Sequence, residues 1–295
     1  MMRRVGLFLA TNLALLVVLG VVMNLLEPWL VAQGINVNHA GVLIFALIFG
    51  MGGAFLSLAM SKRIALMSMR ARVIDQPANP TERWLVETVQ RQAKEAGVGM
   101  PDVAIFDSPD PNAFATGASR NNSLVAVSTG LLRNMRPNEV EAVLGHEVAH
   151  VANGDMITMT LLQGVLNTMV LLLARVFGQI IDRVVFRSNS AFGPGYFLSV
   201  IVMQIVLGIL ASMVVMAFSR WREFRADAGG AKLAGRQNMI AALKRLKQAH
   251  QGRADLPESV EAMGIRGRTG MGFKRLMMSH PPLDERIRAL EEGAR

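Results

Sequence analysis

His146-Glu147-Val148-Ala149-His150 places two histidines four residues apart. On a helix, both imidazoles project from one face, one turn apart. Neutral imidazoles at this spacing can both bind one zinc ion. Glu147 would then lie beside a water bound to the ion, from which it can take a proton. Because so short a motif also recurs by chance, the rest of the sequence has to supply its context.

The residues around the motif predict the helix that this chemistry requires. Asn138 is a candidate N-cap, and Glu141 three positions later completes a capping-box pattern. Gly154 is a suitable residue to end the helix. The motif is therefore expected on a helix and not in a loop or strand.

The polar stretch before the motif predicts a folded unit with a small sheet. Residues 81–96 have helical periodicity and stop at a glycine. Residues 103–107, 112–116 and 123–128 have strand patterns separated by turn residues, and we expect them to form an antiparallel sheet.

The middle strand includes Asn112, Ala113, Phe114 and Ala115. As an edge strand it could pair with the extended backbone of a bound peptide. It could also be an internal strand of the sheet. We favour the edge position, although the alternation of side chains is compatible with both.

The composition indicates a membrane protein, since 52% of the residues are hydrophobic and only 18% are charged. Four runs lack Asp, Glu, Lys and Arg and are about as long as a bilayer-spanning helix, which needs about 20 residues. They cover residues 5–26, 40–61, 156–174 and 196–219. The absence of charge within them argues against a transporter.

The basic residues beside the first two runs predict their orientation. Arg3 and Arg4 precede the first run, and Lys62 and Arg63 follow the second. By the positive-inside rule, the N-terminus and the segment after Arg63 lie in the cytoplasm. An even number of crossings then places the C-terminus on the same side.

Two features of these runs have alternative interpretations. The third and fourth runs could span the bilayer as a hairpin, which we favour, or pack partly against protein, because Arg175, Arg183 and Arg187 lie between them. Glycines in the second run could allow close helix packing, or be ordinary glycines of a membrane helix. We favour the second interpretation for these glycines, which are Gly50, Gly52 and Gly53.

The net charge of +9 comes mainly from the end of the chain, where 16 basic and 9 acidic residues follow position 219. No pattern of a nucleic-acid-binding module accompanies this charge, so we expect no nucleic-acid partner. A basic domain lying against anionic lipid explains it more simply. Because the chain has no cysteine, any metal must be held by His, Asp or Glu.

A third metal ligand is expected just after the fourth apolar run. Glu223 is the natural candidate, and Asp227, one turn later, could accept a hydrogen bond from a liganding histidine and fix its tautomer. Alternatively, both carboxylates merely balance Arg220, Arg222 and Arg225. The presence of the histidine motif favours the ligand interpretation.

Several further stretches carry a family resemblance. They are Met1-Met2-Arg3 with Leu7-Phe8 and Thr11-Asn12-Leu13, Asn112-Ala-Phe-Ala-Thr-Gly117, Val125-Ala-Val-Ser-Thr-Gly-Leu131, the histidine motif with Asn153-Gly-Asp155, Glu223-Phe-Arg-Ala-Asp-Ala-Gly229, and Ser279-His-Pro-Pro-Leu-Asp284 with Arg286-Ile. In this order they resemble the HtpX-type membrane zinc metallopeptidases of bacteria, distant relatives of the CAAX prenyl proteases.

The resemblance implies roles for particular residues. His146, His150 and Glu223 would bind one zinc ion per chain, and Glu147 would be the general base. We expect Asp227 and Asn153 to support the ligands. His280, with Arg286 as the alternative, is our candidate for stabilising the oxyanion. His280 could equally be an ordinary turn histidine before two prolines.

The expected fold is a mainly α integral membrane protein with four transmembrane helices and an α+β cytoplasmic zinc-peptidase domain. Its parts are two N-terminal helices in 1–61, catalytic segments in 62–155 and 220–295, and a second membrane hairpin in 156–219. The expected function, which includes the resemblance, is a zinc endopeptidase of the bacterial inner membrane that cleaves unfolded or damaged membrane proteins at the cytoplasmic face. The alternative is a catalytically silent zinc-binding adaptor.

Overall fold

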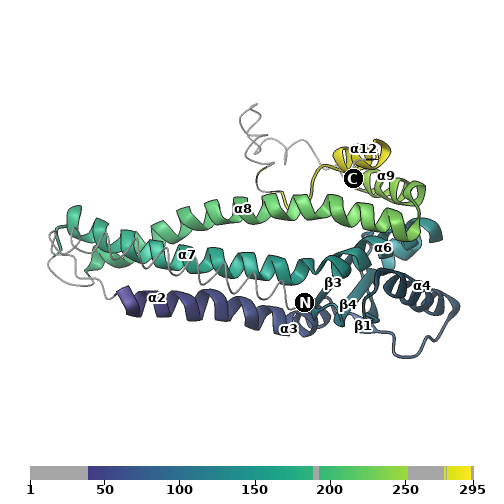
Figure 1. Cartoon of the computed structure of the whole chain (residues 1–295), viewed down its shortest axis with the longest axis horizontal. Helices are drawn as coiled ribbons and strands as arrows, with labels where there is room; N and C mark the ends of the chain where they lie inside the picture. The colour runs from purple at the N-terminus through teal and green to yellow at the C-terminus, as the bar shows by residue number, and fades with distance from the viewer. Residues whose placement is uncertain (1–38, 189–192, 252–275, 277, 294–295) are drawn as a thin grey trace. The chain divides into compact units, whose positions relative to one another are not determined.

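The computed structural model describes residues 39–188, 193–251, 276 and 278–293. It divides into two compact units. The first comprises residues up to Leu56 together with Thr160–Val215, and the second comprises Ser57–Met159 and Met216–Arg295. Figure 1 shows the elements of both units.

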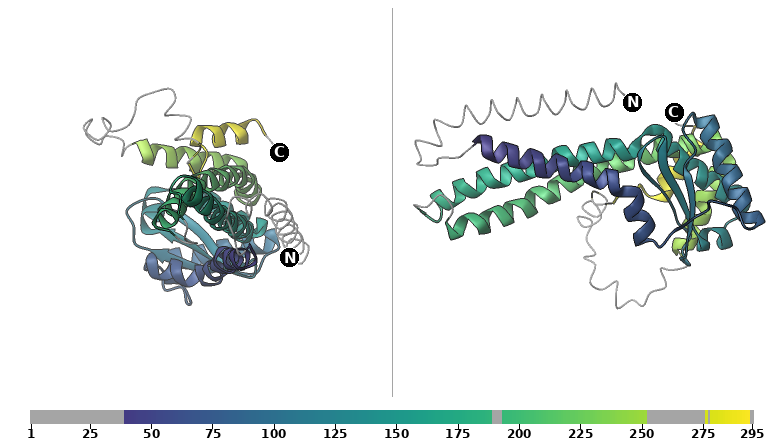
Figure 2. Two further views of the ribbon diagram at one scale, coloured as in Figure 1. Left: turned by 90° about the vertical axis from the view of Figure 1, so that its left-hand side faces the viewer. Right: turned by 90° about the horizontal axis from the view of Figure 1, so that it is seen from below.

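The first unit is built from parts of long apolar helices. Helix α2 (His39–Leu47), a π-helical turn η1 (Ile48–Gly52) and α3 (Gly53–Ser68) follow one another directly, and α7 (Asp155–Val184) and α8 (Pro194–Ala234) supply the rest. The unit includes α3 up to Leu56, α7 from Thr160 and α8 up to Val215, and the other parts of these three helices belong to the second unit. The left view of Figure 2 looks along these helices.

Three helical stretches in the described part of the chain are long and apolar enough to cross a membrane: Gly41–Ser68, Asp155–Val184 and Gly195–Ala234. They contain the third and fourth predicted runs and all of the second run except residue 40. The first predicted run, residues 5–26, lies outside the described residues. In the described range the structure therefore supports three candidate spans, against four predicted for the whole chain.

Glycines set the helix packing in this unit at particular positions. A Cβ at Gly50 would lie 2.6 Å from the backbone nitrogen of Thr168 on α7, so this glycine permits a close approach. Gly52 and Gly53 have nothing within 4 Å of such a Cβ. The preferred interpretation was therefore wrong for Gly50 and holds for its two neighbours.

Two of the three arginines between the last two apolar runs have partners within the first unit. The guanidinium of Arg175 lies 4.1 Å from the ring centroid of Phe45, and its Nη1 donates to the carbonyl of Leu171. Arg183 donates to the carbonyl of Ser188. These contacts offset part of the cost of placing charge between apolar segments.

The second unit contains a four-stranded sheet of β1 (Arg72–Val73), β2 (Asp102–Phe106), β3 (Ala113–Ser119) and β4 (Asn122–Ser128), in the order β1-β2-β4-β3. The sheet is mixed, because β2 and β4 pair in parallel while the other two pairs are antiparallel. The prediction of an antiparallel sheet was therefore wrong. The chain passes from β2 to the edge and returns through the β3–β4 hairpin, so that β4 runs in the direction of β2.

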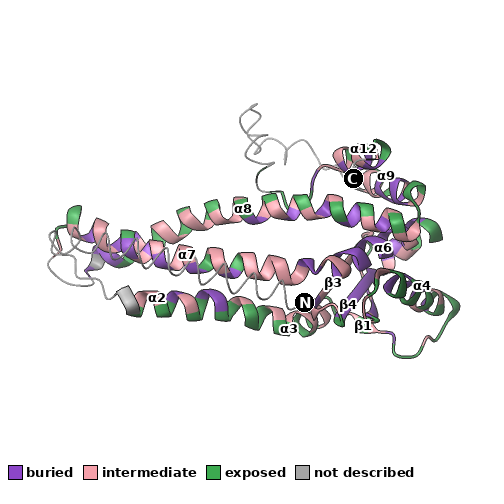
Figure 3. Cartoon of the chain, viewed as in Figure 1, coloured by how far each residue is buried: buried purple, intermediate pink, exposed green. Residues whose placement is uncertain are grey.

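The remaining helices of this unit are α4 (Pro80–Ala96), α5 (Thr129–Asn134), α6 (Pro137–Asn153), α9 (Arg236–Gln251) and α12 (Leu283–Glu291). The alternation of β4 divides its side chains between two cores. Val125 and Val127 join the main core, which includes residues of α4, α6, α9 and α12, and Leu124 and Ala126 pack in a smaller core on the other face. Figure 3 shows α6 and the inner strands as largely buried.

Helix α6 begins earlier than the capping pattern predicted. Pro137 is its first residue, and the backbone N–H of Arg136 donates to Glu139 Oε2 at 2.8 Å. Proline suits this position because its fixed φ is helical and its missing N–H would have no partner there. Asn138, the predicted N-cap, lies inside the helix and donates to Asn238 on α9. The helix ends as predicted at Gly154, where φ is +67°.

Candidate metal centre

The side chains of His146 and His150 project from the same face of helix α6 and converge at their Nε2 atoms. The Nε2 atoms of His146 and His150 are 3.1 Å apart, and their rings meet edge to face at 88°. Both side chains are largely buried. The helical spacing predicted from the sequence therefore brings the two inner nitrogens together.

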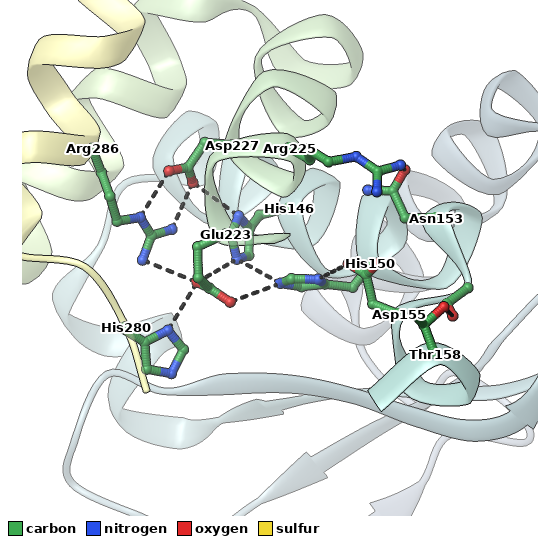
Figure 4. A network of polar contacts seen from close by, with 11 residues as sticks. His146, His150, Asn153, Asp155, Thr158, Glu223, Arg225, Asp227, His280 and Arg286 are labelled. Atoms are coloured by element: carbon green, nitrogen blue, oxygen red, sulfur yellow. Dashed lines mark hydrogen bonds and ion pairs between the residues drawn. The ribbon is translucent and has the colours of Figure 1, made fainter. Parts of the chain in front are cut away.

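Helix α8 brings a carboxylate to the same point (Figure 4). Glu223 is fully buried, with Oε1 3.3 Å from His150 Nε2 and Oε2 3.6 Å from His146 Nε2. Within the described residues, these three side chains form the one group of His and acidic residues that could hold a metal ion.

A second carboxylate lies behind each histidine. His146 Nδ1 is 3.0 Å from Asp227 Oδ1, although the two groups are not aligned for a hydrogen bond. His150 Nδ1 is 2.7 Å from Asp155 Oδ2. A carboxylate beside Nδ1 favours a proton on that nitrogen, which leaves the lone pair of Nε2 directed inward.

The geometry of the cluster fits a divalent metal. Tetrahedral bonds of about 2.0–2.1 Å separate neighbouring ligand atoms by roughly 3.3 Å. The two Nε2 atoms are 3.1 Å apart. Glu223 Oε1 lies 3.3 Å from His150 Nε2 and Oε2 lies 3.6 Å from His146 Nε2, so each imidazole faces a different oxygen of the carboxylate at close to this separation. Both oxygens of Glu223 are buried, and neither makes a well-aligned hydrogen bond with the described residues. Two imidazole nitrogens and a buried carboxylate that converge in this way form a site for a cation.

The electrostatics of the two histidines also indicate a cation site. Burial alone would lower the pKa of His146, but the carboxylates of Asp227 and Glu223 outweigh it and raise the pKa to about 9. For His150, burial is likewise outweighed, and Asp155 and Glu223 raise the pKa. The surrounding carboxylates thus stabilise positive charge at this point, carried by a proton or by a metal ion.

Two glycines allow α8 to lie close enough to α6. A Cβ at Gly230 would lie 2.9 Å from the backbone nitrogen of His146, and one at Gly229 would lie 2.5 Å from the Cβ of Ala149. Because backbone and Cβ atoms cannot move aside as a flexible side chain can, a larger residue would push the helices apart. The contact carries Glu223 and Asp227 toward the histidines.

We therefore expect Gly230→Ala to lower the thermal unfolding temperature and to weaken metal binding. Overpacking of this kind typically costs about 1–3 kcal/mol. Gly208→Ala is the matched control on the same helix, because nothing lies within 4 Å of a Cβ there. Thermal unfolding in detergent and bound-metal content measure both effects. Equal unfolding temperatures for the two variants would contradict the packing argument.

Helix α12 closes the network through Arg286. Its Nε and Nη2 donate to the two oxygens of Asp227 at 2.7 and 2.6 Å, and its Nη1 lies 3.3 Å from Glu223 Oε2. Arg286 is buried, and although burial opposes the charge, its contacts with Asp227 raise the guanidinium pKa. Arg286 thus balances two buried carboxylates.

His280 approaches the site from the segment before α12. Its Nδ1 lies 2.8 Å from Glu223 Oε2, and its side chain is 61% exposed. Glu147, between the two histidines, is 8% exposed and makes no hydrogen bond or ion pair with the described residues. Both side chains can therefore still interact with a bound molecule.

The side chain of Asn153 contacts Arg225, from which its Oδ1 accepts a hydrogen bond at 3.3 Å (Figure 4). The carboxylate behind His150 comes from Asp155, which the sequence reasoning did not single out. It lies five residues beyond the histidine, across the break at Gly154, so helical spacing gives no signal for it. Asp155 belongs to the stretch Asn153-Gly-Asp155, which carries part of the family resemblance.

Replacing Asp155 by Asn should weaken metal binding by about 10–100-fold, because mutation of the residue that contacts a metal-binding histidine typically lowers metal affinity by that factor. Asn153→Ala is the control and should leave the metal affinity near that of the wild type. Competition with a chromogenic chelator measures both constants. An equal loss in the two variants would contradict the assignment.

The predicted strand at 112–116 is β3 at one edge of the sheet. Phe114 packs against Phe106 on the face of the smaller core, while Ala113 and Ala115 pack on the face of the main core. Asn112 precedes the strand, and its N–H donates to Ser128 Oγ. The strand therefore lies at the edge of the sheet, as we favoured, and is not internal.

Comparisons with known proteins show what the whole chain is similar to. Residues 79–294 match the family model described as Peptidase family M48. "Protease HtpX" of Thioalkalivibrio sulfidiphilus is 60% identical over 98% of this chain and 99% of that protein. "Protease HtpX homolog" of Nitrosomonas europaea is 56% identical over 99% of this chain and all of that protein.

A solved structure shares the fold. The crystal structure of S. mikatae Ste24p matches with a TM-score of 0.62 at 18% sequence identity, over 94% of this chain and 67% of that one.

The apolar helices and the buried His–His–Glu cluster, together with these comparisons, define a bacterial membrane metalloprotease. The chain belongs to peptidase family M48, and the predicted resemblance to the HtpX-type enzymes is confirmed.

Proposed function

We propose that this protein is a zinc-dependent endopeptidase that cleaves unfolded or damaged membrane proteins at the cytoplasmic face of the bacterial inner membrane. His146, His150 and Glu223 hold one zinc ion per chain. The observation that carries the proposal is the convergence of one ligand atom from each of these side chains, all within 4.8 Å of one another, in a buried site. Three protein ligands leave a coordination position open, as catalytic zinc sites require.

Bound zinc would supply Lewis-acid chemistry by acidifying a water and polarising a peptide carbonyl. Glu147 is the general base in this proposal. Its carboxylate, which has no partner among the described residues, accepts a proton from the water and returns it to the leaving amine. A purely structural site would have no need of this carboxylate.

The contacts of the two oxyanion candidates favour His280. Its ring is 61% exposed and can reach a bound peptide. Arg286 is buried, and its three side-chain nitrogens already face Asp227 and Glu223. We therefore assign the oxyanion contact to His280 and a supporting role to Arg286.

Substrate would bind as an added strand along β3, with its backbone paired to residues 112–115. Main-chain pairing depends little on sequence, which suits an enzyme that removes many damaged proteins. The catalytic part in 62–155 and 220–295 would face the cytoplasm, with the membrane segments in 1–61 and 156–219. The basic residues beside the apolar runs support this orientation of a multi-pass protein.

Zinc binding should release protons. A histidine with a pKa of about 9 is protonated at pH 7.5 without metal, and zinc can bind only its neutral form. The affinity of His146 for zinc should therefore rise as the pH increases toward about 9 and level off above it. Calorimetry in buffers of different ionisation enthalpy measures the protons released. No proton release at pH 7.5 would contradict the assignment of His146.

The proposal is tested with detergent-purified protein stripped of metal by a chelator. Added zinc should restore cleavage of casein and of the protein itself. If stripped and reloaded protein both fail to cleave while zinc still binds, the adaptor alternative would be favoured. If cleavage is insensitive to chelation, the metallopeptidase assignment is wrong.

A further inference from the structure

A second arginine ties the segment before α12 to α8. Arg220 Nη1 donates to the main-chain carbonyls of Leu276 and Met278, at 3.1 and 2.8 Å. His280 follows two residues after Met278, with Nδ1 2.8 Å from Glu223 Oε2. The Arg220 contacts therefore lie immediately beside the exposed histidine of the site.

Arg220 shares a helix face with the acidic residues of the site. Arg220, Glu223 and Asp227 are spaced three and four residues apart on α8, which places them on one face. All three contact residues between 276 and 286. One face of α8 thus supplies a metal-ligand candidate and holds the segment that carries His280.

The segment needs such an anchor because residues 278–282 form neither helix nor strand. Among the described residues, the carbonyl of Pro282 accepts from the backbone N–H groups of Glu285 and Arg286, whereas residues 278–281 make no backbone–backbone hydrogen bond and rely on side chains or water. On the C-terminal side, Pro281 and Pro282 restrict φ and lead into α12, which Arg286 attaches to Asp227. On the N-terminal side, the hydrogen bonds from Arg220 to Leu276 and Met278 attach the segment to α8 within the described residues. His280 thus lies between two arginine anchors.

We propose that Arg220 is a positioning residue that holds His280 over the metal centre. This inference rests on the proposed function, in which His280 contacts the oxyanion. A guanidinium forms stronger hydrogen bonds to carbonyls than a neutral donor does. Displacement of a catalytic group by about 1 Å can cost roughly 100-fold in rate. Arg220 would therefore act on turnover through His280, without touching the substrate.

The kinetic test compares Arg220→Gln, Arg220→Lys, His280→Ala and the double variant Arg220→Gln/His280→Ala. We expect Arg220→Gln to lower kcat by about tenfold with KM and zinc content unchanged, and the lysine variant to recover part of the loss. His280→Ala should lower kcat by about 100-fold, and the double variant should lower kcat by no more than His280→Ala alone. Lys232→Gln removes an exposed positive charge from the same helix and should leave kcat unchanged. Wild-type kcat in Arg220→Gln, or losses that multiply in the double variant, would overturn the proposal.

A second measurement does not depend on cleavage. Amide hydrogen exchange in the peptide spanning residues 276–284 should be about tenfold faster in Arg220→Gln than in wild type or Lys232→Gln. Unchanged exchange would overturn the anchor whatever the kinetics show. If the wild type fails to cleave while this exchange still responds to Arg220, the proposed function is wrong and the anchor is supported.

Discussion

Glu147→Gln should abolish most proteolysis while leaving the metal in place. The substitution keeps the size of the side chain and removes its ability to accept a proton. General-base catalysis typically contributes about 10²–10⁴-fold, and we expect kcat to fall within that range. Because Glu147 is not among the three residues that could hold the metal, the zinc content should equal that of the wild type. Single-turnover cleavage of casein and metal analysis of the same sample measure the two quantities.

The control for this variant is Glu141→Gln. Glu141 lies on the same helix, where its carboxylate pairs with Arg91 at 2.6 Å on an exposed surface. Exposed ion pairs contribute about 0–1 kcal/mol, so this variant should cleave at nearly the wild-type rate. Equal cleavage by Glu147→Gln and wild type would mean that another group is the base, or that a contaminating protease cuts the substrate.

Glu223→Gln should lose the metal. The substitution replaces a buried carboxylate by a neutral amide, which is a poor zinc ligand. Mutation of a residue that only supports a metal ligand typically lowers metal affinity by about 10–100-fold. We therefore expect the loss of a ligand itself to weaken zinc binding by more than about 100-fold. Cleavage should fall in proportion to zinc occupancy. Competition with a chelator of known affinity measures the constant.

The recovery of activity at high zinc separates this defect from that of Glu147→Gln. Excess zinc should restore part of the cleavage by Glu223→Gln, because its base is intact, and none of the cleavage by Glu147→Gln. Wild-type zinc affinity in Glu223→Gln would show that the carboxylate balances nearby arginines, as the alternative interpretation of the sequence held.

The sequence predicts those parts of the fold that follow from local pattern. Uncharged runs predicted the apolar helices of the described range, and the helical spacing of His146 and His150 predicted their shared face. Three of the four strands were also placed within three residues at their ends, whereas the two-residue strand β1 was not predicted. These features depend on period and composition, which a single sequence displays directly.

Pairing between distant segments is not displayed in the same way. The parallel alignment of β2 with β4 depends on a chain path through the edge strand, and strand patterns alone do not specify it. If each turn is assumed to form a hairpin, all neighbouring strands are predicted to be antiparallel. The parallel pair β2–β4 departs from this assumption and makes the sheet mixed.

The supporting residues of the site illustrate the same limit. Asp227 could be predicted because it lies one helical turn after Glu223. Asp155 follows a helix break, and the two donors of Arg286 to Asp227 join residues 59 positions apart. Only the packed structure shows that these groups meet, because no periodicity connects them.

Anomalous X-ray scattering at the zinc edge from crystals of the Glu147→Gln variant tests most directly whether His146, His150 and Glu223 bind one zinc ion. We expect one strong peak per chain within about 2.0–2.2 Å of both Nε2 atoms and of a Glu223 oxygen. A peak elsewhere, or one that Glu223 does not contact, would contradict this assignment.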